Sequence, residues 1–178
     1  MKKKILAISG STRRLSANLQ LIQAIADLTQ ELYEIELFEG IAQLPHFNPD
    51  LDQHSPPAEV MAFRNKIAAA DGVLICTPEY VFSLPGSLKN ALEWMVSTVI
   101  FTDKPSGLIT ASASGQKGHA ELKLVMKTIG AKFTSKTQLL ISGVRNKLDK
   151  AGNLTDEKTI LELRAFLVSF DKLLKKIP

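Results

Sequence analysis

The sequence is short of the residues that build covalent or metal frameworks. It contains one cysteine, Cys76, and three histidines among 178 residues. A single cysteine excludes an internal disulfide framework and a zinc site made of cysteines. We interpret Cys76 as a buried packing residue, because a phosphatase nucleophile would need an arginine six residues later, where Phe82 stands. Histidine and carboxylate residues form no cluster at ligand spacing, so we expect no metal.

Long apolar runs and aromatic residues are also scarce. Lys2 to Lys4 precede only a brief apolar run, too short for a secretory signal, and no stretch approaches the length of a membrane span. We therefore expect a cytoplasmic protein with no membrane partner. The formal charge is +4, but the lysines are scattered and aromatic residues make up only 6% of the chain, so we expect no nucleic-acid partner. Attraction for anionic ligands explains the charge equally well.

Strand and helix patterns alternate from end to end, which predicts a doubly wound parallel sheet with helices on both faces. The predicted strands are 5–8, 33–38, 72–77, 107–112 and a fifth that begins at 132–135. The five predicted helices include one with an inward stripe of Leu21, Ile25, Leu28 and Leu32, one from Pro85 to about Thr98, and a last one capped by Thr155. The proline-rich segment 44–52 is predicted as a loop.

The segment from Thr77 to Trp94 carries the strongest local signal for a binding site. It begins at the end of residues 72–77, a nearly all-apolar run typical of a strand buried on both faces. Pro78 favours an extended conformation at Thr77, and Pro85 fits the first turn of a following helix. The intervening residues leave the carboxyl end of a strand with unpaired amides, where open α/β sheets bind ligands. We expect a flat ring to lie there against backbone groups.

The segment from Ser9 to Asn18, SGSTRRLSAN, predicts a phosphate site. It joins the first strand to an amphipathic helix, and helix starts present free N–H groups and a partial positive charge. Ser11, Thr12, Arg13 and Ser16 add hydroxyl groups and a guanidinium. The single glycine matches neither a dinucleotide fingerprint nor a nucleoside-triphosphate loop, so we expect a terminal monophosphate. The alternative is an ordinary helix start capped by Ser16.

In a sheet of this kind, the loops after the first, third and fourth strands meet at the carboxyl edge, where the strand order reverses. The unusual loops are therefore expected to be neighbours. A ligand with its phosphate in residues 10–18 and a flat ring against residues 78–84 has the dimensions of flavin mononucleotide (FMN). Residues 112–118 would close the other edge of the site.

The motifs GSTRRLSAN and PEYVFSLPGSLKNALEW together resemble the NADPH-dependent FMN reductase family, which includes bacterial quinone, azo and chromate reductases. The resemblance covers nearly the whole chain. It implies a flavodoxin-like, doubly wound three-layer α/β sandwich whose five-stranded parallel sheet has the order 2-1-3-4-5. We interpret residues 1–178 as a single FMN-binding domain.

The resemblance also implies a set of cofactor-binding residues. The family's first loop reads Gly-Ser-x-Arg-x-x-Ser-x-Asn and binds the FMN phosphate. Its third-strand loop reads Pro-Glu-Tyr-Asn-x-Ser-x-Pro-Gly-x-Leu-Lys-Asn-Ala, and its fourth-strand loop reads Ser-x-x-Gly-x-x-Gly-Gly. We expect no catalytic side chain, because the flavin carries the chemistry. The predicted cofactor-binding residues are Ser11, Arg13, Ser16, Asn18, Pro78, Glu79, Tyr80, Val81, Ser112 and Gly115.

Two positions depart from the family pattern. Val81 stands where the family has asparagine, which removes a side-chain amide near the flavin and is expected to change its potential or affinity. His119 replaces the last glycine of the fourth-strand motif. We interpret His119 as a tolerated surface side chain, with contact to the cofactor or nicotinamide as the alternative. Glu79 has no obvious partner, and we expect only its backbone to matter.

The resemblance implies an FMN-dependent NAD(P)H oxidoreductase. NADPH, or NADH, would pass a hydride to the flavin and leave, and a quinone, free flavin, azo compound or similar acceptor would take its place, giving ping-pong kinetics. Preference for NADPH would depend on a cation at the ribose 2′-phosphate, for which Arg14 and Lys117 are candidates. Relatives form dimers or tetramers, so a homodimer or homotetramer is expected.

Three other functions share this topology. A flavodoxin-type electron carrier is usually acidic and has a different phosphate loop, whereas this chain is basic. A phosphoacceptor receiver domain needs carboxylates where Ser9, Gly10 and Thr77 stand, which argues against it. A cofactor-free relative that serves as a regulatory or interaction subunit stays open because of Val81 and His119.

Overall fold

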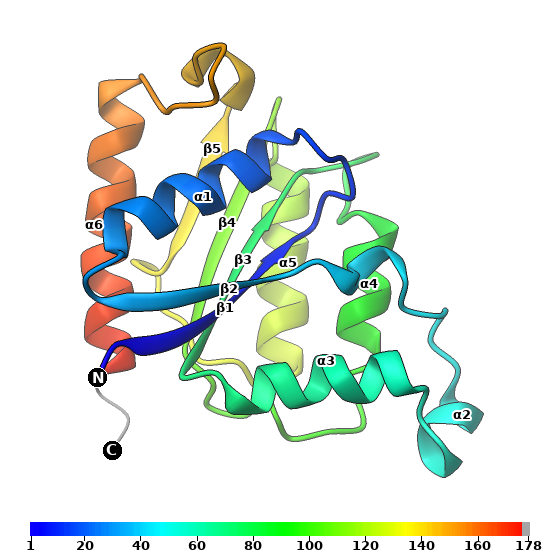
Figure 1. Cartoon of the computed structure of the whole chain (residues 1–178). Coiled ribbons are helices and arrows are strands. Elements are labelled where there is room, and N and C mark those ends of the chain that lie inside the picture. The colour runs from blue at the N-terminus through cyan, green and yellow to red at the C-terminus, as the bar shows by residue number, and fades with distance from the viewer. Residues whose placement is uncertain (176–178) are drawn as a thin grey trace.

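A five-stranded parallel sheet runs through the computed structural model, which describes residues 1–175 (Figure 1). The strands are β1 (Lys3–Ser9), β2 (Tyr33–Phe38), β3 (Gly72–Thr77), β4 (Ser106–Ser112) and β5 (Gln138–Ser142). Their order across the sheet is β2-β1-β3-β4-β5, as predicted, and every neighbouring pair is parallel. This order places the carboxyl ends of β1, β3 and β4 side by side.

Helices cover both faces of the sheet (Figure 1). They are α1 (Ala17–Thr29), α2 (Pro49–His54), α3 (Ala58–Ala69), α4 (Gly86–Glu93), α5 (Gln116–Thr128) and α6 (Glu157–Leu174), with two 3-10 turns, η1 (Gly40–Ala42) and η2 (Val144–Lys147). Helices α3, α4 and α5 pack on one face, and α1 and α6 pack on the other. No helix in the described part of the chain is both long and apolar enough to cross a bilayer.

The central strand β3 shows why this sequence forms a three-layer structure. Successive side chains of a strand point to opposite faces, so an all-apolar strand needs cover on both. Val73 and Ile75 join the core under α3, α4 and α5, whereas Leu74 and Cys76 join the core under α1 and α6. Cys76 is fully buried, which confirms its interpretation as a packing residue, and burial raises the pKa of its thiol.

The fifth strand begins later than predicted. The chain reaches the sheet at Lys132, which forms an isolated bridge with Pro105. A turn then interrupts the pairing, because the Thr137 N–H donates to the Thr134 carbonyl at 3.1 Å and the Thr134 N–H donates to the Thr137 hydroxyl at 2.8 Å. Strand β5 therefore starts at Gln138, and the prediction of 132–135 was wrong.

The helix predictions need three corrections. Segment 44–52, predicted as a loop, contains the start of α2, because the Asn48 side chain accepts a hydrogen bond from the Asp50 N–H at 3.0 Å and Pro49 fits the first turn. Helix α4 ends at Glu93 rather than near Thr98, because the following turns use shorter-range hydrogen bonds. The cap of α6 is Asp156, not Thr155.

The apolar stripe of α1 also differs at its carboxyl end. Leu21 and Ile25 are buried as predicted, but Leu28 and Leu32 are about half exposed, at 54% and 51%. Helix α1 ends at Thr29, so Leu32 lies in the turn that leads to β2. Thr29 is buried instead, and its hydroxyl donates to the Ile25 carbonyl.

Candidate functional site

A cleft of about 580 Å³ lies at the carboxyl edge of the sheet, where four loops meet. It is lined by the loops after β1, β3, β4 and β5. The structure brings together eight of the ten predicted site residues here and leaves out Val81 and Gly115. The eight are Ser11, Arg13, Ser16, Asn18, Pro78, Glu79, Tyr80 and Ser112.

The loop after β1 presents hydroxyl groups and a guanidinium at the start of α1. The Ser16 side chain accepts a hydrogen bond from the Leu19 N–H at 3.1 Å, so Ser16 is the N-cap of α1. The Ser11 hydroxyl accepts from the Arg13 N–H at 3.4 Å. No acidic residue stands in the first turn of α1, which leaves the partial positive charge of the helix start uncompensated. The helix-cap alternative is therefore true of Ser16, and the residues around it still suit an anion.

Asn18 joins this loop to the central strands. Its amide donates to the Ala111 carbonyl at 3.2 Å, and its side-chain oxygen lies 3.2 Å from the Cys76 thiol, which donates to it. Only 3% of Asn18 is exposed, although it lines the cleft floor. Its side chain thereby fixes the start of α1 against β3 and β4.

Glu79 has partners that the sequence did not reveal. Its two carboxylate oxygens accept hydrogen bonds from the backbone N–H groups of Gly115, at 3.2 Å, and Gly118, at 2.7 Å. A Cβ atom at Gly118 would lie 3.1 Å from the Cβ of Glu79, so glycine permits this close approach. The expectation that Glu79 has no partner was wrong, because its carboxylate satisfies the free N–H groups at the start of α5.

Glu121 makes the reciprocal contact from α5. Its carboxylate accepts from the Ser83 hydroxyl at 2.6 Å and from the Leu84 N–H at 3.2 Å. The loop after β3 thus caps α5 through Glu79, and α5 holds the same loop through Glu121. These charge-assisted contacts fix residues 79–84 at both ends.

Between these contacts the chain forms a two-residue hairpin. The backbone groups of Tyr80 and Ser83 exchange two hydrogen bonds of 3.0 Å. The two residues at the tip, Val81 and Phe82, have φ values of +52° and +59°. Positive φ at both central positions is the pattern of a type I′ turn, which favours Asn-Gly and strains a β-branched residue. The tip is also exposed, 94% at Val81 and 76% at Phe82.

We expect the double substitution Val81→Asn with Phe82→Gly to stabilise the protein by about 1–2 kcal/mol, because it removes backbone strain at two positions. The melting temperature should rise by roughly 2–8 °C in a thermal scan. Val99→Asn is the matched control, because Val99 is 79% exposed but does not have a positive φ. A lower melting temperature for the double variant would contradict the prediction and show that the tip packs against another surface.

His119 lies in neither of its expected environments. It is buried, 8% exposed, and its Nδ1 atom lies 2.9 Å from the Thr110 hydroxyl in β4. Burial and the charge of Lys123 lower its pKa to about 4, although a hydrogen bond with Gln138 opposes the shift. His119 is therefore a neutral packing residue near neutral pH. The interpretation as a surface side chain was wrong, and His119 does not line the cleft.

The loop after β5 is the part of the cleft that sequence reasoning missed. Residues 143–146 line it, and among them Arg145 carries a charge. The site was expected to form from the loops after the first, third and fourth strands alone, so this fourth loop was left out. The apolar run LLI at 139–141 followed by Gly143 was the signal that could have placed it.

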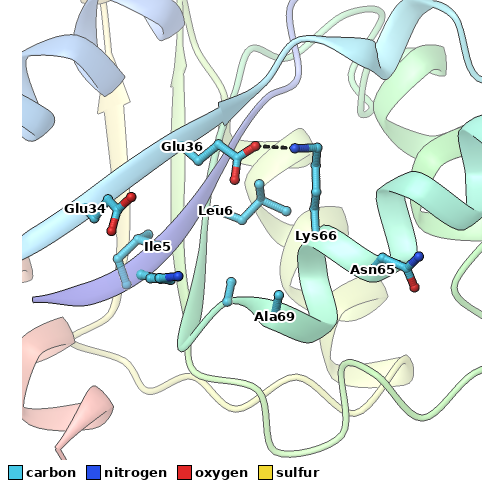
Figure 2. A pocket seen from close by; sticks show the side chains of 9 residues that line it. Ile5, Leu6, Glu34, Glu36, Asn65, Lys66 and Ala69 are labelled. Atoms are coloured by element: carbon cyan, nitrogen blue, oxygen red, sulfur yellow. Dashed lines mark hydrogen bonds and ion pairs between the residues drawn. The ribbon is translucent and has the colours of Figure 1, made fainter. Parts of the chain in front are cut away.

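Other concavities of the described chain lack the combination of hydroxyl groups, arginines and a helix start that lines the cleft. A groove of about 300 Å³ lies between α3 and strands β1 and β2. Figure 2 shows its lining side chains, among which Lys66 pairs with Glu36. Charged residues along β2, an edge strand, protect it from pairing with other chains. An apolar groove between α4 and α5 contains Leu92, Val96 and Leu124. Within residues 1–175, no three histidine, cysteine or carboxylate side chains gather as a metal site would require.

The comparisons with known proteins agree with this arrangement. Residues 3–145 match the model of the family described as NADPH-dependent FMN reductase. The chain is 34% identical to an NADPH:quinone oxidoreductase from Arabidopsis thaliana, over 93% of this chain and 89% of that protein. It is 35% identical to an NAD(P)H-dependent FMN reductase from Pseudomonas aeruginosa, over 87% and 86% of the two chains.

The fold also resembles that of a solved flavoenzyme structure. The flavoenzyme NAD(P)H:(acceptor) oxidoreductase FerB from Paracoccus denitrificans superposes with a TM-score of 0.78 and 27% identity, and the match covers 98% of both chains. The fold, the cleft at the carboxyl edge and the family match over residues 3–145 lead to one conclusion. This chain is an oxidoreductase that belongs to the NADPH-dependent FMN reductase family.

Proposed function

We propose that the chain binds FMN in the cleft and catalyses the NAD(P)H-dependent reduction of small-molecule acceptors such as quinones, free flavin or azo compounds. One observation carries the proposal: the Arg13 side chain lines the cleft beside Ser11 and Ser16 but has no hydrogen-bond or ion-pair partner among residues 1–175. A guanidinium without a partner beside a helix start is suited to a phosphate.

The residues present fit FMN. A volume of about 580 Å³ is within the usual range for small-molecule sites. Ser11, Arg13 and Ser16 would hold the phosphate, while Asn18 fixes their loop. Pro78, Glu79 and Tyr80 would face the flavin ring together with Ser112, whose hydroxyl donates to the Glu79 carbonyl at 3.4 Å. Gly115 would contribute indirectly, because its N–H holds the Glu79 carboxylate. Val81 would contribute through the backbone of the hairpin that it shares with Tyr80.

The protein's own part in the reaction is binding and positioning. Bound FMN would supply the chemistry, accepting a hydride from NADPH or NADH and passing electrons to the acceptor in a second step. The contacts of Glu79 and Glu121 keep the loop after β3 in place, so a ring bound there would meet a preorganised wall. Open access to that wall would let donor and acceptor bind in turn, which gives ping-pong kinetics.

Three further expectations belong to this proposal. The protein would form a single domain over its whole length and assemble as a homodimer or homotetramer, as the family resemblance implies. It would act in the cytoplasm on small molecules. Light scattering on the purified protein would measure its mass and decide between dimer and tetramer.

The proposal is tested by absorption spectroscopy. Purified protein is mixed with FMN, desalted, and then treated with NADPH without oxygen. Retained flavin peaks that bleach would support the proposal. Retained flavin that stays oxidised with both NADPH and NADH would indicate an electron carrier, and loss of all flavin on desalting would favour the cofactor-free relative.

Arg13→Ala should weaken FMN binding by about 10- to 100-fold, because it removes a charge-assisted contact with the phosphate. The free energy of unfolding without FMN should stay unchanged, since the side chain is exposed and makes no hydrogen bond with the described residues. Flavin fluorescence titration measures the FMN affinity, and urea denaturation measures the free energy of unfolding. Arg14→Ala is the matched control, because Arg14 is exposed beside Arg13 but does not line the cleft. Equal FMN affinity in the wild type and Arg13→Ala would contradict the phosphate assignment.

A further inference from the structure

The loop after β5 is fastened to the loop after β4. Strand β5 ends at Ser142, whose hydroxyl donates to the Ser114 carbonyl at 2.6 Å. The Gly143 N–H donates to the Ala113 carbonyl at 3.0 Å, and Gly143 has a φ of +66°, which glycine adopts without strain. These contacts turn the chain into η2 and set Arg145 on the cleft wall.

The two cations of η2 have different surroundings. Lys147 points away to α6, where its ammonium donates to the Thr159 hydroxyl at 2.8 Å and lies 3.5 Å from the Asp156 carboxylate. Arg145 is exposed, lines the cleft, and has no hydrogen-bond or ion-pair partner among residues 1–175. Lys147 therefore has a structural role, whereas the guanidinium of Arg145 is available to a ligand.

The charge of the cleft is unbalanced. Arg13 and Arg145 come from different loops, and neither is paired within the described chain. Glu79 is the one carboxylate among the lining residues that the structure describes, and both its oxygens accept hydrogen bonds from backbone N–H groups at the start of α5. The cleft thus presents two guanidinium groups against a carboxylate whose oxygens are already engaged.

We infer that Arg145 is the second cation of the FMN-phosphate site and that it binds the phosphomonoester together with Arg13. This inference rests on the proposed function. A phosphomonoester carries a charge near −2 at neutral pH, which one arginine does not balance and two do. Val144, the neighbour of Arg145, packs in the same core cluster as Ala17 and Leu21 of α1. Arg145 therefore enters the cleft from the α1 side, where Ser11, Ser16 and Arg13 also line it. The phosphate of FMN is for this reason the assigned ligand rather than the 2′-phosphate of NADPH.

The test compares FMN with riboflavin, which has the same ring but no phosphate. Dissociation constants of both are measured by flavin fluorescence on cofactor-free protein, for the wild type, Arg145→Gln and Lys150→Gln. Lys150 is the control, because it lies exposed a few residues further on, outside the cleft, and its substitution makes the same change in charge. Arg145→Gln should bind FMN about 10-fold more weakly, bind riboflavin as the wild type does, and show a weaker dependence on salt.

Several outcomes would overturn the inference, and they separate it from the proposed function. Wild-type protein that binds no FMN would overturn both. The role of Arg145 alone would be overturned if Arg145→Gln kept the wild-type ratio of FMN affinity to riboflavin affinity. It would also be overturned if Lys150→Gln lost as much FMN affinity as Arg145→Gln. A loss confined to the preference for NADPH over NADH in steady-state kinetics would assign Arg145 to the donor phosphate instead.

Discussion

Gly10→Ala is expected to destabilise the protein by about 3 kcal/mol and to weaken FMN binding, because no side chain fits between the ends of β1 and β3. A Cβ atom at Gly10 would lie 2.1 Å from the Thr77 hydroxyl oxygen and 2.6 Å from the Thr77 Cβ. The Gly10 N–H also donates to the Cys76 carbonyl at 2.8 Å, so the backbone cannot move away without losing a hydrogen bond. The strain therefore falls on the start of the loop after β1, where the phosphate of FMN is proposed to bind.

Urea denaturation of the cofactor-free protein would measure this loss, and the melting temperature should fall by roughly 6–12 °C. Gly86→Ala is the matched control, because a Cβ there would meet nothing within 4 Å at the first residue of α4. That variant should be neutral or up to about 1 kcal/mol more stable. Stabilities of Gly10→Ala and Gly86→Ala that agree within error would show that the contact with Thr77 relaxes freely.

The second large effect is a loss of stability in acid caused by His119. Its folded-state pKa is about 4, below the ordinary value of 6.5, so the unfolded chain binds a proton that the folded chain excludes between these pH values. The stabilising contribution is complete above pH 6.5 and is lost as the pH falls towards 4. Over this window the loss amounts to about 3 kcal/mol.

The measurement is the free energy of unfolding in urea at several pH values from 7 to 4, for the wild type and His119→Gln. Glutamine can keep a hydrogen bond with Thr110 but does not titrate. Between pH 7 and 4, the variant should therefore lose about 3 kcal/mol less stability than the wild type loses. His54→Gln, at an exposed position, should follow the wild type. Parallel curves for the wild type and His119→Gln would contradict the burial of a neutral histidine.

Local patterns in the chain were enough to predict most of the sheet. Strand β3 is a nearly continuous apolar run and strand β2 alternates apolar with charged residues, so both were predicted at their observed limits. The start of β5 was misplaced because the turn at Thr134 to Thr137 depends on hydrogen bonds between those residues and on pairing with β4. Arg145 was missed for a separate reason, because the loop after the fifth strand was not expected at the site.

Side chains whose partners are distant in sequence were predicted least well. Glu79 meets Gly115 and Gly118 only after β3 and β4 pair and α5 packs beside them. His119 is buried because its position on α5 faces Thr110 in β4. No local pattern carries such contacts, since they depend on how the elements pack.

The sequence by itself determined the alternation of strands and helices, the family, and the two motifs that line the cleft, because these follow from local periodicity and from short contiguous patterns. Only the tertiary structure decided which charges face the cleft. Among residues 1–175, Arg13 and Arg145 have no hydrogen-bond or ion-pair partner, whereas Glu79 is engaged at the start of α5. The packing of segments more than thirty residues apart sets the neighbours of each charge.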